Sequence, residues 1–268
     1  MKKTLALLVA LVATLALSVG PAGAITDGTL DGEGHPYVGL MVAHDAKGNP
    51  LWRCSGTLIS PKVFLTAGHC TEAPAAHAEI WFQSDVQSNA AALGYPFTGQ
   101  VGGKTYTHPE YNPNAFYVRD LGVVVLDGKG MSMSQYGQLP ALNQLDALHT
   151  GSSTRFTAVG YGLQKAFPDA TAWKESTQKV RMVANPYLVQ INGGLVGDFS
   201  LLLSNNAYSG GTCFGDSGGP NFVGTSNVVG GVTSFGLNST CGGSGGVFRV
   251  DRSWSLNWLY GSFGKYLG

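Results

Sequence analysis

The run Gly-Asp-Ser-Gly-Gly-Pro at residues 215–220 surrounds a single serine, Ser217, with residues that free the backbone. A serine hydroxyl is a weak nucleophile at neutral pH, so it needs a neighbouring base and donors for the negative charge that develops on the substrate. Glycine lacks Cβ, so the chain can turn tightly and aim the amides of Gly215 and Ser217 at one point. A lone Gly-Asp-Ser-Gly is also found in ordinary turns, whereas the whole hexapeptide just after Cys213 is more specific. We therefore predict that Ser217 is a nucleophile.

His69 is the predicted base among the six histidines. It follows the apolar run at residues 63–66 and precedes Cys70, a setting that fixes an imidazole in place. Taken alone, His69 would equally fit a packed turn, so its assignment depends on the other two motifs.

A third group must orient His69 and favour its imidazolium form. Asp120 opens an apolar run at residues 121–126, so its carboxylate should stand at a strand end beside apolar core. A carboxylate there is costly unless it is paired and hydrogen-bonded. The rivals Asp85 and Asp127 lie in turn-like surroundings, which indicate solvated surface.

Short apolar or alternating runs bounded by turn residues fill the chain after Ile25, which is typical of β-strands. The run at 121–126 is apolar on both faces and predicts a fully buried strand. Many short strands favour barrels or sandwiches over βαβ units, and a boundary near residues 127–138 would divide the chain into two β halves. Long helices are scarce, and the best candidate lies near the end, where Asp251 could cap it. Further strands are predicted at residues 37–42, 56–59, 63–66, 155–162, 199–203 and 227–235.

Residues 1–24 have the pattern of a secretory signal peptide. Lys2 and Lys3 precede an apolar run at residues 4–19, and Ala-Gly-Ala at 22–24 fits the cleavage site. The apolar run is short for a membrane span. We therefore expect a secreted, extracellular protein that begins at Ile25 and has no membrane association after cleavage.

Composition excludes several classes of protein. Sixteen basic residues balance sixteen acidic ones, so there is no basic field for nucleic acid and no such partner is expected. Four cysteines in an exported chain favour disulfides, and of three possible connectivities the pairing of neighbours, which closes two local loops, is favoured. A zinc site would need closely paired ligands such as Cys-x-x-Cys, which the sequence lacks. We predict neither a metal nor a cofactor.

The three motifs occur in the order His, Asp, Ser, and together they resemble those of the chymotrypsin (trypsin-like) family of serine endopeptidases. Thr-Ala-Gly-His-Cys at residues 66–70, Asp120 before its Val/Leu strand, and residues 215–220 carry the resemblance. The order itself discriminates, since subtilisins and α/β-hydrolases use other orders. The resemblance covers almost all of the chain after residue 24.

The resemblance implies an all-β fold of two six-stranded antiparallel barrels packed face to face with a C-terminal helix. The barrels would span about residues 25–130 and 131–250, and the helix about 251–262. Cys54–Cys70 and Cys213–Cys241 match two disulfides of the family. Other bridges of vertebrate members are missing, which favours a bacterial-type member. A protein or peptide substrate and a monomer are implied.

The mechanism implied by the resemblance is acyl transfer. Ser217 attacks the scissile carbonyl, His69 takes its proton and later gives it to the leaving amine, and Asp120 holds the His69 tautomer. The amides of Gly215 and Ser217 form the oxyanion hole.

The resemblance also implies an activation pair. In the family, a freed N-terminal amine pairs with the aspartate before the nucleophile, here Ile25 with Asp216. Cleavage after Ala24 would expose Ile25 directly, so the enzyme is expected to become competent on export. The start Ile-Thr-Asp-Gly departs from the commoner Ile-Val-Gly-Gly.

The specificity pocket is carried over by position from Ser217. Gly211 should lie at its base with Thr212 beside it, and Gly246 should leave its mouth open. Ser234, Phe235 and Gly236 should form the wall and the backbone edge that pairs with substrate. A pocket without a carboxylate at its base disfavours Lys and Arg at P1 and favours large apolar residues. Glutamate is a weaker alternative, because Thr233 stands where a histidine might.

Two other functions are compatible with the family fold. A catalytically inactive binding module usually lacks a triad residue, whereas all three are present here. An esterase is allowed by the acyl-enzyme chemistry, but the edge at residues 234–236 fits an extended peptide. The run Asn-Ser-Thr at 238–240 also fits the pattern for N-glycosylation.

Overall fold

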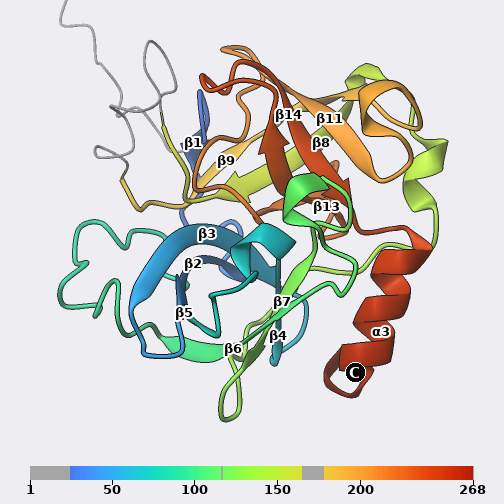
Figure 1. The fold of residues 1–268 in the computed structure, drawn as a ribbon. Helices are drawn as coiled ribbons and strands as arrows, with labels where there is room; N and C mark the ends of the chain where they lie inside the picture. Colours follow the sequence, from blue (N-terminus) through green and yellow to red (C-terminus); the bar gives the residue numbers. More distant parts are fainter. Residues whose placement is uncertain (1–24, 116, 165–177, 268) are drawn as a thin grey trace, which may run out of the picture.

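The computed structural model describes residues 25–115, 117–164 and 178–267. The predicted signal peptide lies outside the described residues. Among these residues, two antiparallel β-barrels stand one above the other, with one long helix beside the lower barrel (Figure 1). The expected fold of two six-stranded barrels and a C-terminal helix is confirmed.

The first barrel is closed in the order β2-β3-β4-β7-β6-β5. Its strands β2 and β4 are buried along their whole length. The strands are β2 (Val38–His44), β3 (Pro50–Leu58), β4 (Val63–Thr66), β5 (His77–Trp81), β6 (Val101–Thr107) and β7 (Gly122–Leu126).

The second barrel closes through β8, whose two halves pair with different neighbours. The first half pairs with β10 and the second half with β12, so the ring runs β8-β10-β11-β14-β13-β12. The strands are β8 (Gly151–Gly160), β10 (Tyr187–Gln190), β11 (Ser200–Asn205), β12 (Pro220–Val223), β13 (Val229–Gly236) and β14 (Gly243–Arg249).

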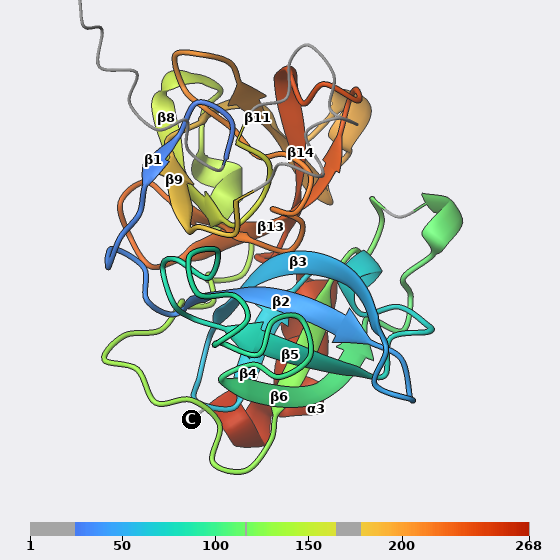
Figure 2. The same cartoon turned by 90° about the vertical axis from the view of Figure 1, so that its left-hand side faces the viewer.

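Two short strands extend this second sheet. β1 (Thr29–Leu30) pairs with β9 (Met182–Ala184), which pairs with the end of β8. Figure 2 shows both beside the second barrel. The N-terminal segment therefore adds to the second barrel's sheet, although residues 25–30 were expected in the first barrel, because the ladder partner that β1 needs is β9.

A buried arginine ties this N-terminal segment to the first barrel. Arg181 is fully buried and its Nε donates to Asp31 at 2.8 Å. Its Nη1 donates to the carbonyls of Val38 at 3.2 Å and Phe82 at 2.9 Å, and its Nη2 to that of Gly32 at 2.6 Å. The donors of a buried guanidinium need acceptors, and Asp31 together with these three carbonyls accepts from all three of its nitrogens.

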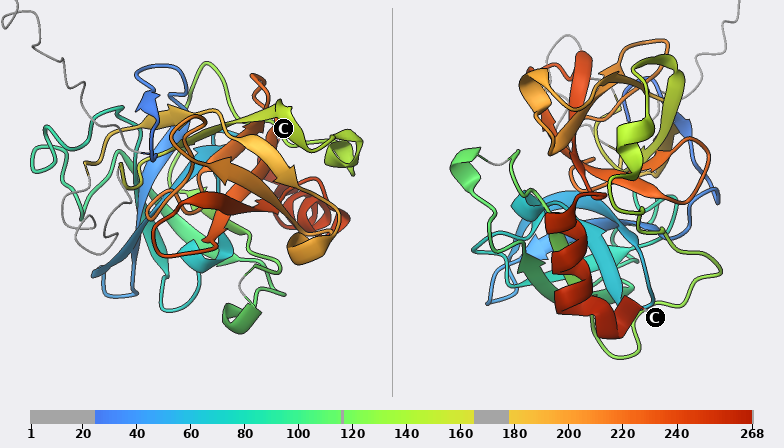
Figure 3. Two further views of the ribbon diagram at one scale, coloured as in Figure 1. Left: turned by 90° about the horizontal axis from the view of Figure 1, so that it is seen from above. Right: turned by 90° about the vertical axis from the view of Figure 1, so that its right-hand side faces the viewer.

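The C-terminal helix α3 (Ser253–Leu267) packs on the first barrel (Figure 3). Its Leu259 and Phe263 enter the same core cluster as Phe64 and Val123, which holds the two barrels and the helix together. The helix is longer than the expected 251–262. Within the described residues, the Asp251 side chain does not cap the helix, because its buried carboxylate accepts from Arg249 at 2.9 and 2.8 Å and from the Leu145 amide at 2.9 Å. Short 3₁₀ turns complete the fold: η1 (Gly68–Cys70), η2 (Pro113–Ala115), η3 (Gln144–Ala147) and η4 (Gly194–Val196).

Candidate active site

His69 lies in the 3₁₀ turn η1, which follows β4. The turn is held from two sides, since Cys70 is bridged to Cys54 of β3 and the His69 amide donates to Asp120 Oδ1 at 2.9 Å. Gly68 is needed here, because a Cβ at this position would lie 2.9 Å from the Tyr111 ring. The turn therefore presents the imidazole in one fixed orientation.

Asp120 lies directly behind His69 and is fully buried. Its Oδ2 is 2.9 Å and its Oδ1 3.2 Å from His69 Nδ1, and it also accepts a hydrogen bond from the Ser234 hydroxyl. A carboxylate facing Nδ1 holds the proton on that nitrogen and leaves Nε2 as the acceptor. The geometry is that of a base held by a carboxylate.

The pKa of His69 is set by opposing effects. Burial lowers it, but the charge and hydrogen bond of Asp120 and the charge of Glu72 raise it, and the net result is a pKa above the ordinary value. A base whose pKa lies near the working pH is the most effective proton acceptor.

Ser217 lies in a tight turn between the two barrels. Gly215 and Gly218 have φ angles of +95° and +76°, which favour glycine, and a Cβ on Gly218 would lie 2.0 Å from Thr66 Oγ1. The Ser217 carbonyl accepts from the Ser55 amide of β3 at 2.8 Å, and the Gly218 amide donates to Thr233 of β13 at 2.8 Å. The turn is thus fastened to a strand of each barrel.

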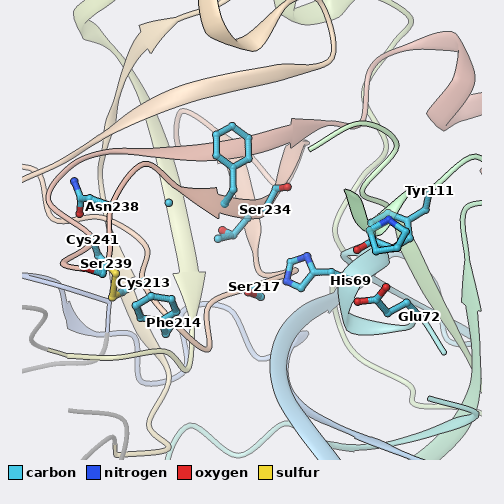
Figure 4. Close-up of a pocket in the computed structure, with 14 residues that line it drawn as sticks. His69, Glu72, Tyr111, Cys213, Phe214, Ser217, Ser234, Asn238, Ser239 and Cys241 are labelled. Atoms are coloured by element: carbon cyan, nitrogen blue, oxygen red, sulfur yellow. A yellow bond between two sulfur atoms is a disulfide. The ribbon is translucent and has the colours of Figure 1, made fainter. Parts of the chain in front are cut away.

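Ser217 and His69 lie next to one another in a cavity of about 620 Å³ (Figure 4). Within the described chain, the amides of Gly215 and Ser217 donate to no protein acceptor. Backbone amides are rarely left without an acceptor, so two of them beside a serine hydroxyl are a ready site for an oxyanion. A hydroxyl, an imidazole, a buried carboxylate and two open donors together can perform acyl transfer.

The predicted pocket residues divide into two groups. Ser234, Phe235 and Gly236 line the cavity, whereas Gly211, Thr212 and Gly246 are not among its lining residues. Thr233, the predicted disulfide pair Cys213 and Cys241, and Asn238 and Ser239 of the predicted glycosylation run also line the cavity. Sequence reasoning had not singled out Glu72, Tyr111, Pro113 and Phe214. The first three belong to the first-barrel half of the chain and lie beside Ser217 only because the two barrels face one another.

Close packing behind the wall explains the two glycines. A Cβ on Gly211 would lie 2.3 Å from the Asn205 side chain, and one on Gly246 would lie 2.3 Å from the Phe235 ring. Thr212 is fixed beside them, since its carbonyl accepts from Asn205 Nδ2 at 2.8 Å. These three residues pack behind the residues that line the pocket and do not line it themselves.

Asp216, the neighbour of Ser217, is fully buried. Its carboxylate accepts from the amides of Gly162 at 2.7 Å and Cys213 at 2.9 Å. Burial raises the pKa of Asp216 to about 7, although those two amides and the charge of Arg53 act to lower it. Ile25 is also fully buried, against Ala158, Met182 and Ala184, and among the described residues no ion pair reaches Asp216.

The structure contains both disulfides, Cys54–Cys70 and Cys213–Cys241. His69 lies close to the first, but both sulfurs of that cluster are committed to the bridge. Two bridges of this kind are typical of proteins that work in an oxidising compartment. Within the described ranges, none of the helices has the length and apolar character needed to cross a membrane.

Comparison with known proteins agrees with this geometry. The chain is 27% identical over 233 residues to a chymotrypsin from Phaedon cochleariae, covering 84% of this chain and 76% of that protein. Among solved structures, HL collagenase has a TM-score of 0.67 at 21% identity, covering 90% of this chain and 99% of the other. Human heparin binding protein has a TM-score of 0.65 at 20% identity, covering 88% and 96%. At these identities the structural matches show the fold alone.

A match to a family model bears directly on the family of this chain. The family model described as Trypsin matches residues 32–257, which is most of the chain and includes the His69, Asp120 and Ser217 motifs. The chain is a member of the trypsin family, a serine endopeptidase that hydrolyses peptide bonds.

Proposed function

We propose that Ser217, His69 and Asp120 form the catalytic triad of a secreted endopeptidase. The observation that carries this proposal is the buried Asp120 carboxylate, which accepts from the His69 amide at 2.9 Å and faces Nδ1 at 2.9 Å. His69 is thereby held with Nε2 free to accept the Ser217 proton.

The reaction would proceed through an acyl-enzyme. As His69 removes its proton, the Ser217 oxygen attacks the scissile carbonyl carbon, and the resulting oxyanion accepts from the amides of Gly215 and Ser217. The imidazolium then protonates the leaving amine, and the peptide bond breaks. Water repeats the sequence with the same base, which releases the acid and restores the Ser217 hydroxyl.

A large apolar P1 side chain is the substrate we propose. Supporting this, the wall at Ser234, Phe235 and Gly236 carries no carboxylate, and the acidic residue in the cavity lining, Glu72, is beside His69 rather than beside that wall (Figure 4). Without a carboxylate at its end, a pocket gives no compensation for burying Lys or Arg. Profiling the purified protein on a peptide library would test this, and dominant cleavage after Lys or Arg would contradict it.

Export would complete the enzyme. We propose that signal cleavage after Ala24 frees the Ile25 amine, which then pairs with Asp216 and orders the oxyanion hole with Gly211, Thr212 and Gly246 behind the pocket. The support is that Asp216 is buried without an ion-pair partner in the described chain and has a raised pKa. Edman sequencing of secreted protein should give Ile25 as the first residue, and any other start contradicts this step.

A fluorophosphonate probe tests the triad directly. The secreted protein should be labelled and should cleave peptides, and Ser217→Ala should abolish both. Ser239→Ala is a matched control, because Ser239 lines the same cavity and should remain labelled. Absence of labelling in correctly processed protein would favour a binding module, and labelling without peptide cleavage would favour an esterase.

A further inference from the structure

A second cavity of about 500 Å³ adjoins the first and shares His69, Glu72, Phe214 and Ser217 with it. The edge at residues 234–236, which the proposed function assigns to the substrate residues before the scissile bond, lines only the first cavity. The substrate residues before and after the scissile bond lie on opposite sides of Ser217. Since the first cavity takes the residues before the bond, the second cavity is assigned to the residues that follow it. It is lined by Trp52, Arg53, Cys54, His69, Glu72, Leu163, Phe214, Gly215 and Ser217.

Arg53 of β3 is the cation of this cavity. Its guanidinium has no hydrogen bond or ion pair to any described residue, and its Nε is shielded from water without a partner. This contrasts with Arg181, whose buried guanidinium is bonded on every side. An unpartnered buried N–H is costly, so such a donor marks a place where a ligand can supply the missing acceptor.

The position of Arg53 places it beside the reacting centre. A Cβ built on Gly215 would lie 2.8 Å from Arg53 Nη2 and 3.3 Å from Nε, so the guanidinium lies against the proposed oxyanion hole. A substrate group close to the scissile bond on the leaving side would therefore be within reach.

Charged neighbours leave Arg53 available. Asp216 lies near enough to feel its charge, but that carboxylate is already bonded to the amides of Gly162 and Cys213. Lys179 is a second cation close to Arg53, and it adds to the positive potential. Glu72 lines the same cavity but forms no ion pair with Arg53.

We propose that Arg53 binds a carboxylate of the leaving group, and so makes the enzyme prefer substrates that are acidic just after the scissile bond. The guanidinium presents paired donors that match a carboxylate. Two sources supply this chemistry: an Asp or Glu side chain at P1′, P2′ or P3′, or the free C-terminus of a short leaving peptide. The inference rests on the proposed function, because the cavity is assigned by the direction of the peptide.

The test compares matched peptides that share one P1 residue. One arm places Asp or Asn at P1′, P2′ or P3′ in peptides with amidated C-termini, and the other compares free with amidated C-termini on short leaving groups. We expect kcat/KM to favour the carboxylate by about tenfold in at least one position, the effect of one charge-assisted hydrogen bond. The arm that shows the preference identifies the source.

Variants assign the preference to Arg53. Arg53→Gln should reduce the ratio to about one, and Arg53→Lys should retain part of it. Lys47→Gln is a matched control, since it removes an equal charge from the turn of the same β2–β3 hairpin and should leave the ratio unchanged.

Two outcomes would overturn the inference. The first is an unmodified enzyme that cleaves Asp and Asn peptides equally and also cleaves free and amidated peptides equally. The second is an Arg53→Gln variant that keeps the preference, and if its activity falls equally on all peptides, the result would show that Arg53 supports Asp216 instead. The first outcome is measured on the unmodified enzyme, so it does not depend on whether a variant folds. Failure of the proposed function is distinguishable, because then neither fluorophosphonate labelling nor cleavage of uncharged peptides would be seen.

Discussion

Asp120 receives donors from both barrels. The amide and Nδ1 of His69 come from the first barrel, and the Ser234 hydroxyl comes from β13 of the second. Ser234 therefore acts as a positioning residue that holds the carboxylate against the imidazole. Removing it leaves one lone pair of a buried carboxylate without a donor.

Ser234→Ala should lower kcat by about 10- to 100-fold, since hydrogen bonds to charged groups contribute about 1.5–3 kcal/mol. KM should change little, because the backbone edge at residues 234–236 is retained. Steady-state kinetics on one peptide would measure both constants. A Ser234→Thr variant that keeps the hydroxyl should recover part of the loss, and an unchanged kcat in Ser234→Ala would contradict the role.

Glu72 should shift the acid limb of the pH profile. The proposed base His69 accepts a proton only when neutral, so activity should fall as the pH drops through its pKa, which Asp120 and Glu72 raise from the ordinary 6.5. Removing the Glu72 charge lowers that pKa, so Glu72→Gln should shift the acid limb of kcat/KM to lower pH. The exposed Asp198→Asn, which removes an equal charge elsewhere, should leave the profile in place. A shift to higher pH in Glu72→Gln would contradict this electrostatic role.

At the scale of elements, the two disulfides fix different walls of the site. Cys54–Cys70 joins β3 to the turn that carries His69 across a separation of 16 residues, and Cys213–Cys241 fixes the pocket wall across 28. Replacing either pair with alanines should lower the free energy of unfolding by about 3 kcal/mol, as loop-closure entropy predicts.

The kinetics of the two double variants should differ although their stabilities fall alike. Loss of Cys54–Cys70 loosens the base and should mainly lower kcat, whereas loss of Cys213–Cys241 loosens the substrate pocket and should mainly raise KM. Urea unfolding and steady-state kinetics at a temperature where both variants remain folded would separate these effects. The same kinetic change in both would contradict the assignment.

The strands that the sequence predicts best are those with an uninterrupted apolar pattern. The run at 121–126 became β7 (Gly122–Leu126) because a strand buried on both faces leaves no polar side chain to interrupt it. β1 and β9 carry two and three residues, too few to show a period, and they exist because each completes the other's ladder.

At the scale of the whole molecule, Asp31 and Arg181 join the N-terminal segment to both barrels. Asp31→Asn would leave a buried guanidinium without its counter-charge, so the free energy of unfolding should fall by about 3–5 kcal/mol. Urea unfolding at neutral pH would measure the loss. A change within about 0.5 kcal/mol, as for an ordinary surface substitution, would contradict this role.

The same pair predicts a pH window for stability. Burial raises the pKa of Asp31. The hydrogen bond and charge of His35 and the hydrogen bond of Arg181 outweigh that effect, so the pKa lies below the ordinary 3.8. The ionised carboxylate is therefore favoured in the folded state, so its contribution is complete above pH 3.8 and is lost as the pH falls through the lower folded pKa. Asp31→Asn should lack this acid-dependent component.

Some residues of the candidate site can be predicted from a local sequence motif, whereas others depend on the arrangement of the whole molecule. His69, Asp120 and Ser217 could be found because each lies in a local motif. Arg53 and Glu72 could not, because they line a cavity only once two barrels face one another. Gly211 and Gly246 were placed by counting from Ser217, which gives the neighbourhood but not whether a residue faces the cavity or the packing behind it.

The exposed Asn238 at the rim of the first cavity has a practical consequence for producing this enzyme. A eukaryotic expression host that glycosylates the Asn-Ser-Thr run at 238–240 would attach a bulky sugar at the entrance to the pocket. Such material should still react with small probes but should cleave folded proteins poorly, and enzymatic removal of the sugar should restore cleavage. A specificity profile measured on the glycosylated enzyme would therefore reflect restricted access to the pocket as well as the preference of the pocket itself.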